Sequence, residues 1–211
     1  MVLVHPEFRG RGIAAQLMGA CICYLKQKQV RSIKLDATDM GRPVYLKLGF
    51  HDEEPVVRYM NENPPVRDAA SGHITEVLNW AGIAGLDQTA FGANRIALLK
   101  NLSVNGPAVQ YSKSGTSDFG FGFARAGFRA NFIGPIVATS TAVAQEILCG
   151  LLVRLSNKPV MIDILPDNQR AGELITSLGF KPSRSLTRMC SGVRNTGNTR
   201  TVFGTAGFEF G

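Results

Sequence analysis

The sequence has no hydrophobic run near the roughly 20 residues that a helix needs to cross a membrane. Only 18% of the residues are charged, whereas 45% are hydrophobic, which is typical of a globular protein. No basic segment followed by an apolar core, the pattern of a signal peptide, lies near Met1. We therefore expect a cytoplasmic protein that does not enter a membrane.

Residues that bind metals or form disulfides are also few. The 211 residues include four cysteines, none in a C-x-x-C pair, and three scattered histidines. No H-E-x-x-H motif occurs. This usage excludes a disulfide framework and predicts that the protein holds no metal.

The positive charge is not concentrated in one segment. The formal net charge is +7, but the excess of Lys and Arg is distributed along the chain, without a basic run or interleaved aromatic residues. Nucleic acid is therefore a poorly supported partner. A small anionic ligand and no particular ligand agree equally well with this charge.

The first sixteen residues, MVLVHPEFRGRGIAAQ, contain the most informative pattern. The apolar residues Val2–Val4 predict a short strand, and His5-Pro6 predicts a turn. The glycine-spaced basic loop Arg9–Gly12 follows, and a helix is expected from Ile13. Glycines let backbone amides approach a ligand, and a helix N-terminus adds partial positive charge. Arginines can pair with phosphate oxygens. The pattern predicts a phosphate cradle.

Hydrophobic periodicity and turn residues predict alternating helices and strands. In the first part we expect helices over 13–28 and 42–48 and strands over 33–36 and 56–60. Asn61–Gly72, with Pro64-Pro65, predicts a linker. Beyond it we expect helices over 91–102, 142–155 and 169–178, and strands over 108–111, 119–126, 131–138 and 160–164.

The two halves repeat each other at an offset near 130 residues. Leu48-Gly49-Phe50 aligns with Leu178-Gly179-Phe180, and Arg58 aligns with Arg188. With a three-residue insertion, the strand ending at Asp36 aligns with the strand containing Asp163. The same order of elements occurs twice, so we infer an internal duplication.

The second copy lacks the polar residues of the first. Arg9–Gly12 aligns with Thr139–Ala142, which has neither glycine nor charge, and Tyr45 aligns with Ile175. We expect any phosphate site in the first copy alone.

Two types of phosphate loop agree with these residues. Gly10-x-Gly12-x-x-Ala15, with Asp36 about twenty residues later, satisfies a dinucleotide-binding fingerprint. In that motif, however, the first glycine directly follows the strand, and here Pro6–Arg9 intervene. A dinucleotide-binding protein is the less favoured interpretation.

The chain more closely resembles the GNAT superfamily of acyl-CoA N-acetyltransferases. Arg9–Ala14 is similar to the family's loop pattern Q/R-x-x-G-x-G/A, and Tyr45–Phe50 is similar to its later Y-x-K-x-G-F segment. Residues 87–211 look like the degenerate second domain of tandem members. The resemblance implies an α/β fold of two GNAT-like units, with mixed sheets and flanking helices, divided into a partial domain (1–61), a linker (62–86) and a degenerate domain (87–211).

The resemblance also implies a function and a site. The function is transfer of an acetyl group from acetyl-CoA to a primary amine, by direct attack in a ternary complex. Backbone groups of Leu3 and Val4 would follow the pantetheine arm, and Tyr45 would protonate the departing thiolate. The less favoured alternative for Tyr45 is a half-buried aromatic that packs its helix on the sheet. The diphosphate would be bound by the loop residues Arg9, Gly10, Arg11, Gly12, Ile13 and Ala14.

Family members place a strand, two helices and two further strands before the loop, and none precedes Met1. We therefore expect an incomplete first unit: a truncated reading, one that borrows strands from the second copy, or one that exchanges them in a homodimer. The candidate general bases are Glu7, Asp36 and His51. The acceptor, a small-molecule or peptide amine, is not encoded in a motif. A non-catalytic CoA-binding or scaffold module is the alternative function.

Overall fold

The computed structural model describes residues 2–64, 72–155, 158–194 and 197–210. The helices are η1 (Pro6–Phe8), α1 (Ile13–Gln27), α2 (Arg42–Lys47), α3 (Trp80–Phe91), α4 (Ile96–Val104), α5 (Thr141–Leu152), α6 (Gln169–Ser177) and η2 (Thr199–Thr201). The strands are β1 (Ser32–Ala37), β2 (His51–Asn61), β3 (Ile74–Thr75), β4 (Ala108–Ser112), β5 (Phe119–Arg125), β6 (Asn131–Ala138), β7 (Val160–Ile164), β8 (Lys181–Gly192) and β9 (Val202–Gly204).

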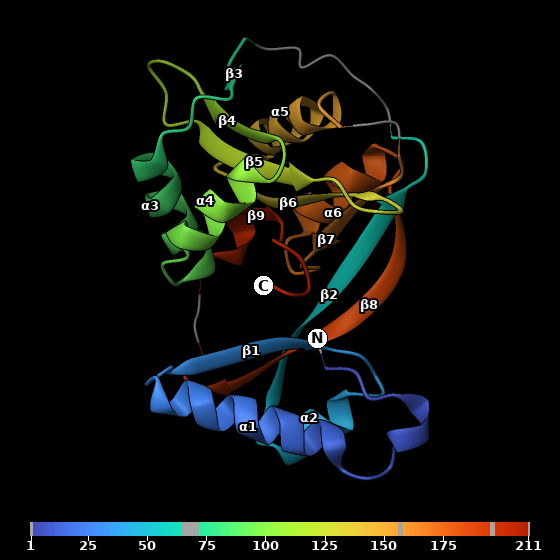
Figure 1. Ribbon diagram of the computed structural model, residues 1–211. Coiled ribbons are helices and arrows are strands. Elements are labelled where there is room, and N and C mark those ends of the chain that lie inside the picture. The colour runs from blue at the N-terminus through green and yellow to red at the C-terminus, as the bar shows by residue number, and fades with distance from the viewer. Residues whose placement is uncertain (1, 65–71, 156–157, 195–196, 211) are drawn as a thin grey trace.

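All of these strands join one sheet in the order β1-β8-β2-β7-β6-β5-β4-β3, with β9 paired to β6. The β6–β7 pair is parallel and the other pairs are antiparallel, so the sheet is mixed. Helices flank the sheet (Figure 1). The predicted mixed α/β class is confirmed, although both parts of the chain share one continuous sheet.

Strands from the two parts of the chain alternate at one end of this sheet. β8, near the C-terminus, lies between β1 and β2, and β2 lies between β8 and β7. Figure 1 shows these two long strands running from the part that contains β1, α1 and α2 to the part that contains α3–α6. The C-terminal strand β8 is thus shared between the two parts, and β1 forms one edge of the sheet.

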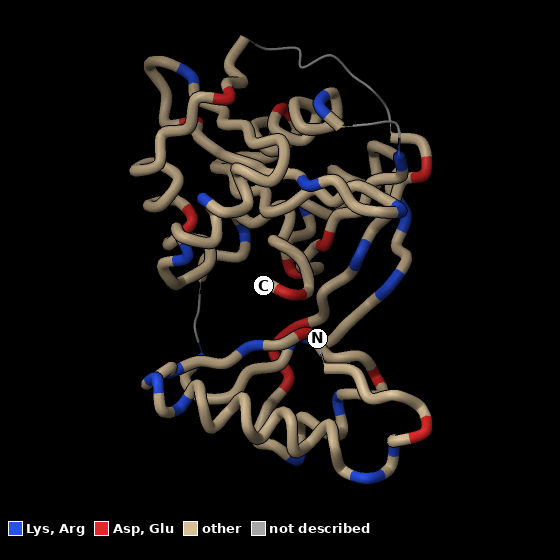
Figure 2. The backbone as a smooth tube through the Cα atoms, in the orientation of Figure 1, with Lys and Arg blue, Asp and Glu red and all other residues tan. Residues whose placement is uncertain are grey.

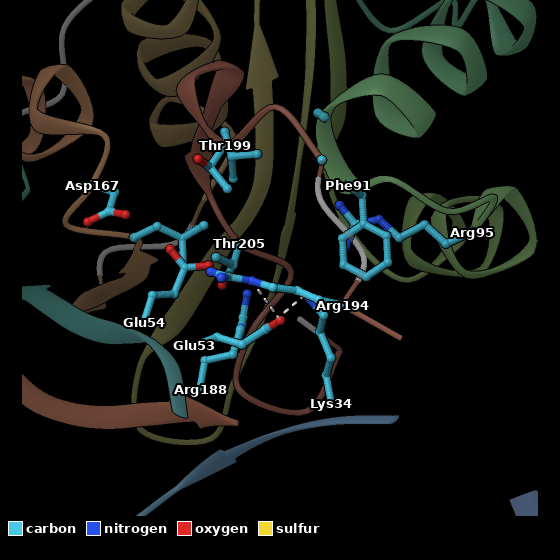
Figure 3. A pocket seen from close by; sticks show the side chains of 14 residues that line it. Lys34, Glu53, Glu54, Phe91, Arg95, Asp167, Arg188, Arg194, Thr199 and Thr205 are labelled. Carbon is cyan, nitrogen blue, oxygen red and sulfur yellow. Dashed lines mark ion pairs between the residues drawn. The ribbon is translucent and has the colours of Figure 1, made fainter. Parts of the chain in front are cut away.

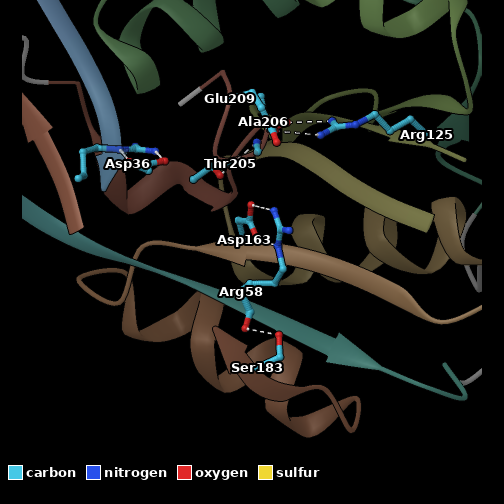
Figure 4. Close-up of polar contacts among 10 residues, drawn as sticks. Asp36, Arg58, Arg125, Asp163, Ser183, Thr205, Ala206 and Glu209 are labelled. Carbon is cyan, nitrogen blue, oxygen red and sulfur yellow. Dashed lines mark hydrogen bonds and ion pairs between the residues drawn. The ribbon is translucent and has the colours of Figure 1, made fainter. Parts of the chain in front are cut away.

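Residues that the predicted repeat aligns form reciprocal ion pairs across these strands. The Arg58 guanidinium donates to both Asp163 oxygens at 2.7 and 2.8 Å (Figure 4). The Arg188 guanidinium donates to both Asp36 oxygens at 2.9 and 3.0 Å. Burial raises the pKa of Asp163, and the hydrogen bond and charge of Arg58 oppose that rise. Each pair joins one strand of the N-terminal part to one strand of the C-terminal part.

Most of the core lies in the C-terminal part, on both faces of the sheet. One cluster, which includes Ile133 and Ile147, packs under α5 and α6, and another, which includes Ile83 and Phe121, packs under α3 and α4. The N-terminal part has only a small cluster of Ala37, Phe50 and Met189. None of the residues of α1 is fully buried. The N-terminal part therefore depends on the strands it shares for its position.

The predicted strand at Val2–Val4 is wrong. These residues form no ladder, and Leu3 is 79% exposed. The Arg9 side chain donates to the Val4 carbonyl at 3.2 Å instead of a neighbouring strand. An apolar run forms a strand only where another strand edge accepts its hydrogen bonds.

The predicted helix over 91–102 is also wrong at its start. α3 begins at Trp80, where the Asn79 side chain accepts from the Gly82 amide, and it ends at Gly92, whose φ is +85°. α4 then begins at Ile96. The first part of α3 lies within 62–86, which we predicted as linker, and residues 65–71 lie outside the described residues. Glycines within α3 weaken its sequence pattern.

The other predicted helices and strands are confirmed to within a few residues, except that β2 begins five residues before its expected start at Val56. Among the residues described, none of the helices combines the length and apolar composition required to cross a bilayer.

Candidate functional site

The loop Arg9–Gly12 has the backbone conformation that its glycines predict. Gly10 and Gly12 have φ values of +77° and +74°, in the left-handed region. A Cβ atom added at either glycine would meet nothing within 4 Å. Glycine is therefore required at these two positions for its backbone conformation and not for lack of space, and the space beside their Cα atoms is open.

The N-terminus of α1 has no side-chain cap. Gly12 is its N-cap residue, and the first helical hydrogen bond runs from the Gln16 amide to the Gly12 carbonyl at 3.0 Å. The amides of Ile13, Ala14 and Ala15 therefore precede the helical hydrogen bonds. Together with the helix dipole, they suit an anion. Arg11 is exposed beside this end of the helix, with its guanidinium 5.3 Å from the Phe8 ring centre.

The corresponding helix of the second copy is capped by the protein itself. The Ser140 hydroxyl accepts from the Val143 amide at 3.3 Å at the start of α5. The preceding Thr139 hydroxyl accepts from the Phe119 amide at 3.1 Å. The expected difference between the two loops thus has a structural counterpart, because a side chain already satisfies an amide of the second loop.

The strands behind that second loop are also bridged by the chain. β6 and β7 pair only over their first three residues, from Asn131–Val160 to Ile133–Ile162. Farther along, β9 pairs with β6, and the Thr205 amide donates to the Asp163 carbonyl of β7 at 2.8 Å. The C-terminal segment therefore hydrogen-bonds to both strands where they separate.

Tyr45 lies on α2 and is half-buried. Its ring makes an edge contact with Phe50, with 6.0 Å between ring centres, and packs on the small N-terminal cluster. A Cβ at Gly41 would lie 3.1 Å from the Tyr45 Cε2 atom, so Gly41 leaves room for the ring. Within the described residues, the Tyr45 hydroxyl takes part in no recorded hydrogen bond. The Tyr45 ring therefore packs its helix on the sheet, and its hydroxyl is not used in that packing.

Helices α1 and α2, which carry the loop and Tyr45, lie side by side against the same end of the sheet (Figure 1). Leu3 and Val4 precede η1, which separates them from the glycines. Arg9 is bound to the Val4 carbonyl, so its side chain holds the segment in place. The structure brings the loop residues together as one surface, and Tyr45 lies on the neighbouring helix α2.

A cavity of about 170 Å³ lies between the two parts of the chain (Figure 3). Its walls come from β1, β2 and β8 on one side, and from the end of α3, the segment after β7 and the segment around η2 on the other. An adjoining cavity of about 280 Å³ shares Lys34, Phe91 and Arg188 with it and reaches along β1. Acidic positions gather where β2 crosses between the parts (Figure 2).

Two glutamates on β2 face this cavity. The register of β2 against β8 shifts between Asp52 and Glu54, so Glu53 is the extra residue of a bulge, a feature that redirects side chains. Glu53 is only 3% exposed and pairs with Lys34 at 2.8 Å. Glu54 is half-buried, and burial raises its pKa, with Arg188 opposing and Asp167 adding to the rise.

The general bases expected from the sequence do not occupy such a position. Both carboxylate oxygens of Asp36 accept from Arg188, which leaves this residue a structural role. Glu7 is exposed with an oxygen 3.8 Å from His5 Nδ1, and His51 is exposed at the start of β2. Sequence analysis missed Glu53, Glu54 and Asp167. The acidic run Asp52–Glu54 at the start of an otherwise apolar strand was the available indication.

Comparisons with known proteins agree with this fold. Residues 83–204 and residues 1–60 match two models, each described as an acetyltransferase (GNAT) domain. The uncharacterised N-acetyltransferase YitH of Bacillus subtilis is 26% identical over 184 residues, which make up 85% of this chain. The chain spans 64% of the length of YitH.

Solved structures show the same architecture. A candidate acetyltransferase from Pyrococcus horikoshii has a TM-score of 0.81 and 27% identity, over 99% of this chain and 69% of that protein. A tandem GNAT protein from the clavulanic acid biosynthesis pathway has a TM-score of 0.59 at 13% identity, over 92% and 74% of the two chains, and shows the fold alone. Because one GNAT model covers more than half of the sequence, the chain belongs to the GNAT acetyltransferase family.

Proposed function

We propose that this protein transfers an acetyl group from acetyl-CoA to a primary amine. One observation carries the proposal: the N-terminus of α1 is open and uncapped behind two left-handed glycines, whereas the repeat-related end of α5 is closed by Ser140. The loop amides and Arg11 would hold the diphosphate of coenzyme A. Acetyl-CoA supplies an acetyl group already activated as a thioester.

The residues of the chain would act by positioning and by moving protons. In the proposed step, a C–N bond forms between the amine and the acetyl carbon, and the C–S bond breaks. The Tyr45 hydroxyl would give its proton to the departing sulfur. Glu54 would take the proton that the nitrogen loses, because its burial makes it a stronger base than an exposed carboxylate.

Tyr45 can be tested by measuring thiol release from acetyl-CoA with a panel of primary amines. Tyr45→Phe keeps the ring packing on Phe50 and removes only the hydroxyl, so we expect kcat to fall about a hundredfold. Tyr24→Phe is the matched control, since Tyr24 is exposed in the last turn of α1, at the end of the helix away from the loop. A kcat of Tyr45→Phe equal to wild type would remove the acid role from Tyr45.

The alternative is a CoA-binding module without catalysis, which the packing of Tyr45 against Phe50 favours. Coenzyme A binding without thiol release for any amine would support it. A dinucleotide site is poorly supported, because η1 separates the first residues from the glycine loop and none of the described residues before the loop forms a strand.

A further inference from the structure

We propose that the acceptor is an alkyl amine with a second positive charge, held in the cavity between the two parts of the chain by Glu54 and Asp167. This inference rests on the proposed acetyl transfer and names its substrate class. Glu54 would bind the reacting nitrogen, and Asp167, at the more exposed side of the cavity, would bind the second cationic group.

The other charged side chains that line the cavity form ion pairs with one another or with neighbouring residues, whereas these two carboxylates do not within the described residues. Arg188 donates to both oxygens of Asp36, and Arg95 donates to both oxygens of Asp87 at 2.9 Å. Glu53 is paired with two cations, Lys34 at 2.8 Å and Arg194 at 3.6 Å.

Glu54 and Asp167 form no hydrogen bond or ion pair within the part of the chain that the structure describes. Figure 3 shows the Glu54 side chain between those of Glu53 and Asp167. The two carboxylates are close enough for Asp167 to act on the charge of Glu54. A ligand with two positive charges would satisfy both groups.

Part of the cavity wall is apolar. Phe91, Leu165 and Val202 line it together with Ala90. Leu165 and Ala90 are buried, with 4% and 2% of their surface exposed, so this wall belongs to the core. Methylene groups gain free energy when they leave water for such a surface. An alkyl chain between two ammonium groups therefore agrees with the wall and with its two unpaired carboxylates.

The two parts of the chain contribute different ends of this site. Glu54 lies on β2, in the N-terminal part, while Asp167, Leu165 and Val202 belong to the C-terminal part. The second copy lacks an open loop of its own. In this proposal its role is to supply the wall and the carboxylate that select the acceptor.

The test compares three acceptors of similar length in the thiol-release assay: 1,4-diaminobutane, 4-amino-1-butanol and 4-aminobutanoate. Their distal groups are positive, neutral and negative. Because Asp167 is exposed, we expect kcat/KM for the diamine to exceed that for the amino alcohol by about fivefold. The anionic acceptor should be slower than both.

Asp167→Asn should abolish the preference for the diamine over 4-amino-1-butanol. Glu173→Gln, on an exposed residue of α6 outside the cavity, is the charge-matched control and should preserve the preference. Equal kcat/KM for the diamine and the amino alcohol with wild-type protein would overturn the proposal, and so would a preference that survives Asp167→Asn.

Failure of the proposed function would look different, because no amine would then release thiol. In that case calorimetric titration with 1,4-diaminobutane and with 4-amino-1-butanol, each in the presence of coenzyme A, decides the matter. Tighter binding of the diamine that Asp167→Asn removes would support the site, and equal binding of the two would exclude it.

Discussion

The ion pair between Arg188 and Asp36 should be essential to stability, and Arg188→Met tests this. The side chains are 6% and 2% exposed, and the guanidinium donates to both carboxylate oxygens. Removing the arginine would leave a carboxylate buried without its partner. Breaking a buried pair in this way costs about 3–5 kcal/mol. For a protein of this size, that loss lowers Tm by about 6–20 °C.

Urea unfolding followed in parallel by circular dichroism and by fluorescence measures this loss. The single tryptophan, Trp80, lies on α3 in the C-terminal part, whereas Asp36 lies on β1 in the N-terminal part. Because β8 and β2 interleave the two parts, we expect both signals to shift together. Independent unfolding would instead leave the fluorescence midpoint in place.

Two further variants make the result specific. Asp36→Leu with Arg188→Met removes both charges, and we expect it to recover most of the loss. Arg42→Met removes an exposed arginine that pairs with Asp52 on the surface, and its midpoint should stay close to wild type. A loss below about 1 kcal/mol for Arg188→Met, or a double variant as unstable as the single one, would refute the reasoning.

Three other variants test separate features. Burial raises the pKa of Glu54 in the folded protein above its ordinary value of 4.5, so the ionised carboxylate destabilises the fold. Glu54→Gln should therefore have a higher Tm than wild type at pH 8. The difference in Tm should close at pH 4, where the carboxyl is protonated in both states. Ser140→Ala removes the cap of α5 and should cost about 1 kcal/mol in urea unfolding without changing coenzyme A affinity. Gly120→Ala would place a Cβ 2.7 Å from Ile147 Cδ1, so we expect a loss of about 1–3 kcal/mol, and unchanged stability would show that the core adjusts freely.

The sequence predicted well those features that depend on neighbouring residues. Helices with a clear apolar face, such as α1 and α5, and turns that need a left-handed glycine, such as Gly49 and Gly179, follow from local pattern. α3 was missed because Gly82 weakens its pattern, and the reason for that glycine is distant: a Cβ there would lie 3.0 Å from the Phe119 ring.

Features that depend on strand order were beyond local reasoning. The repeat aligned Arg58 with Arg188 and Asp36 with Asp163. It did not predict that each arginine binds the aspartate of the other copy. That pairing arises only when β8 lies between β1 and β2. Glu54 was missed for the same reason, because its charged neighbours Lys34, Asp167 and Arg188 come from separate segments of the chain.

We propose that one open helix N-terminus, that of α1, binds coenzyme A. Calorimetric titration of coenzyme A into wild type, Gly12→Ala and Ser140→Ala tests it most directly. We predict one site per chain, which Gly12→Ala weakens because alanine is strained at a φ of +74° and Ser140→Ala leaves intact. Absence of binding, two sites per chain, or an affinity that Gly12→Ala does not change would contradict the account.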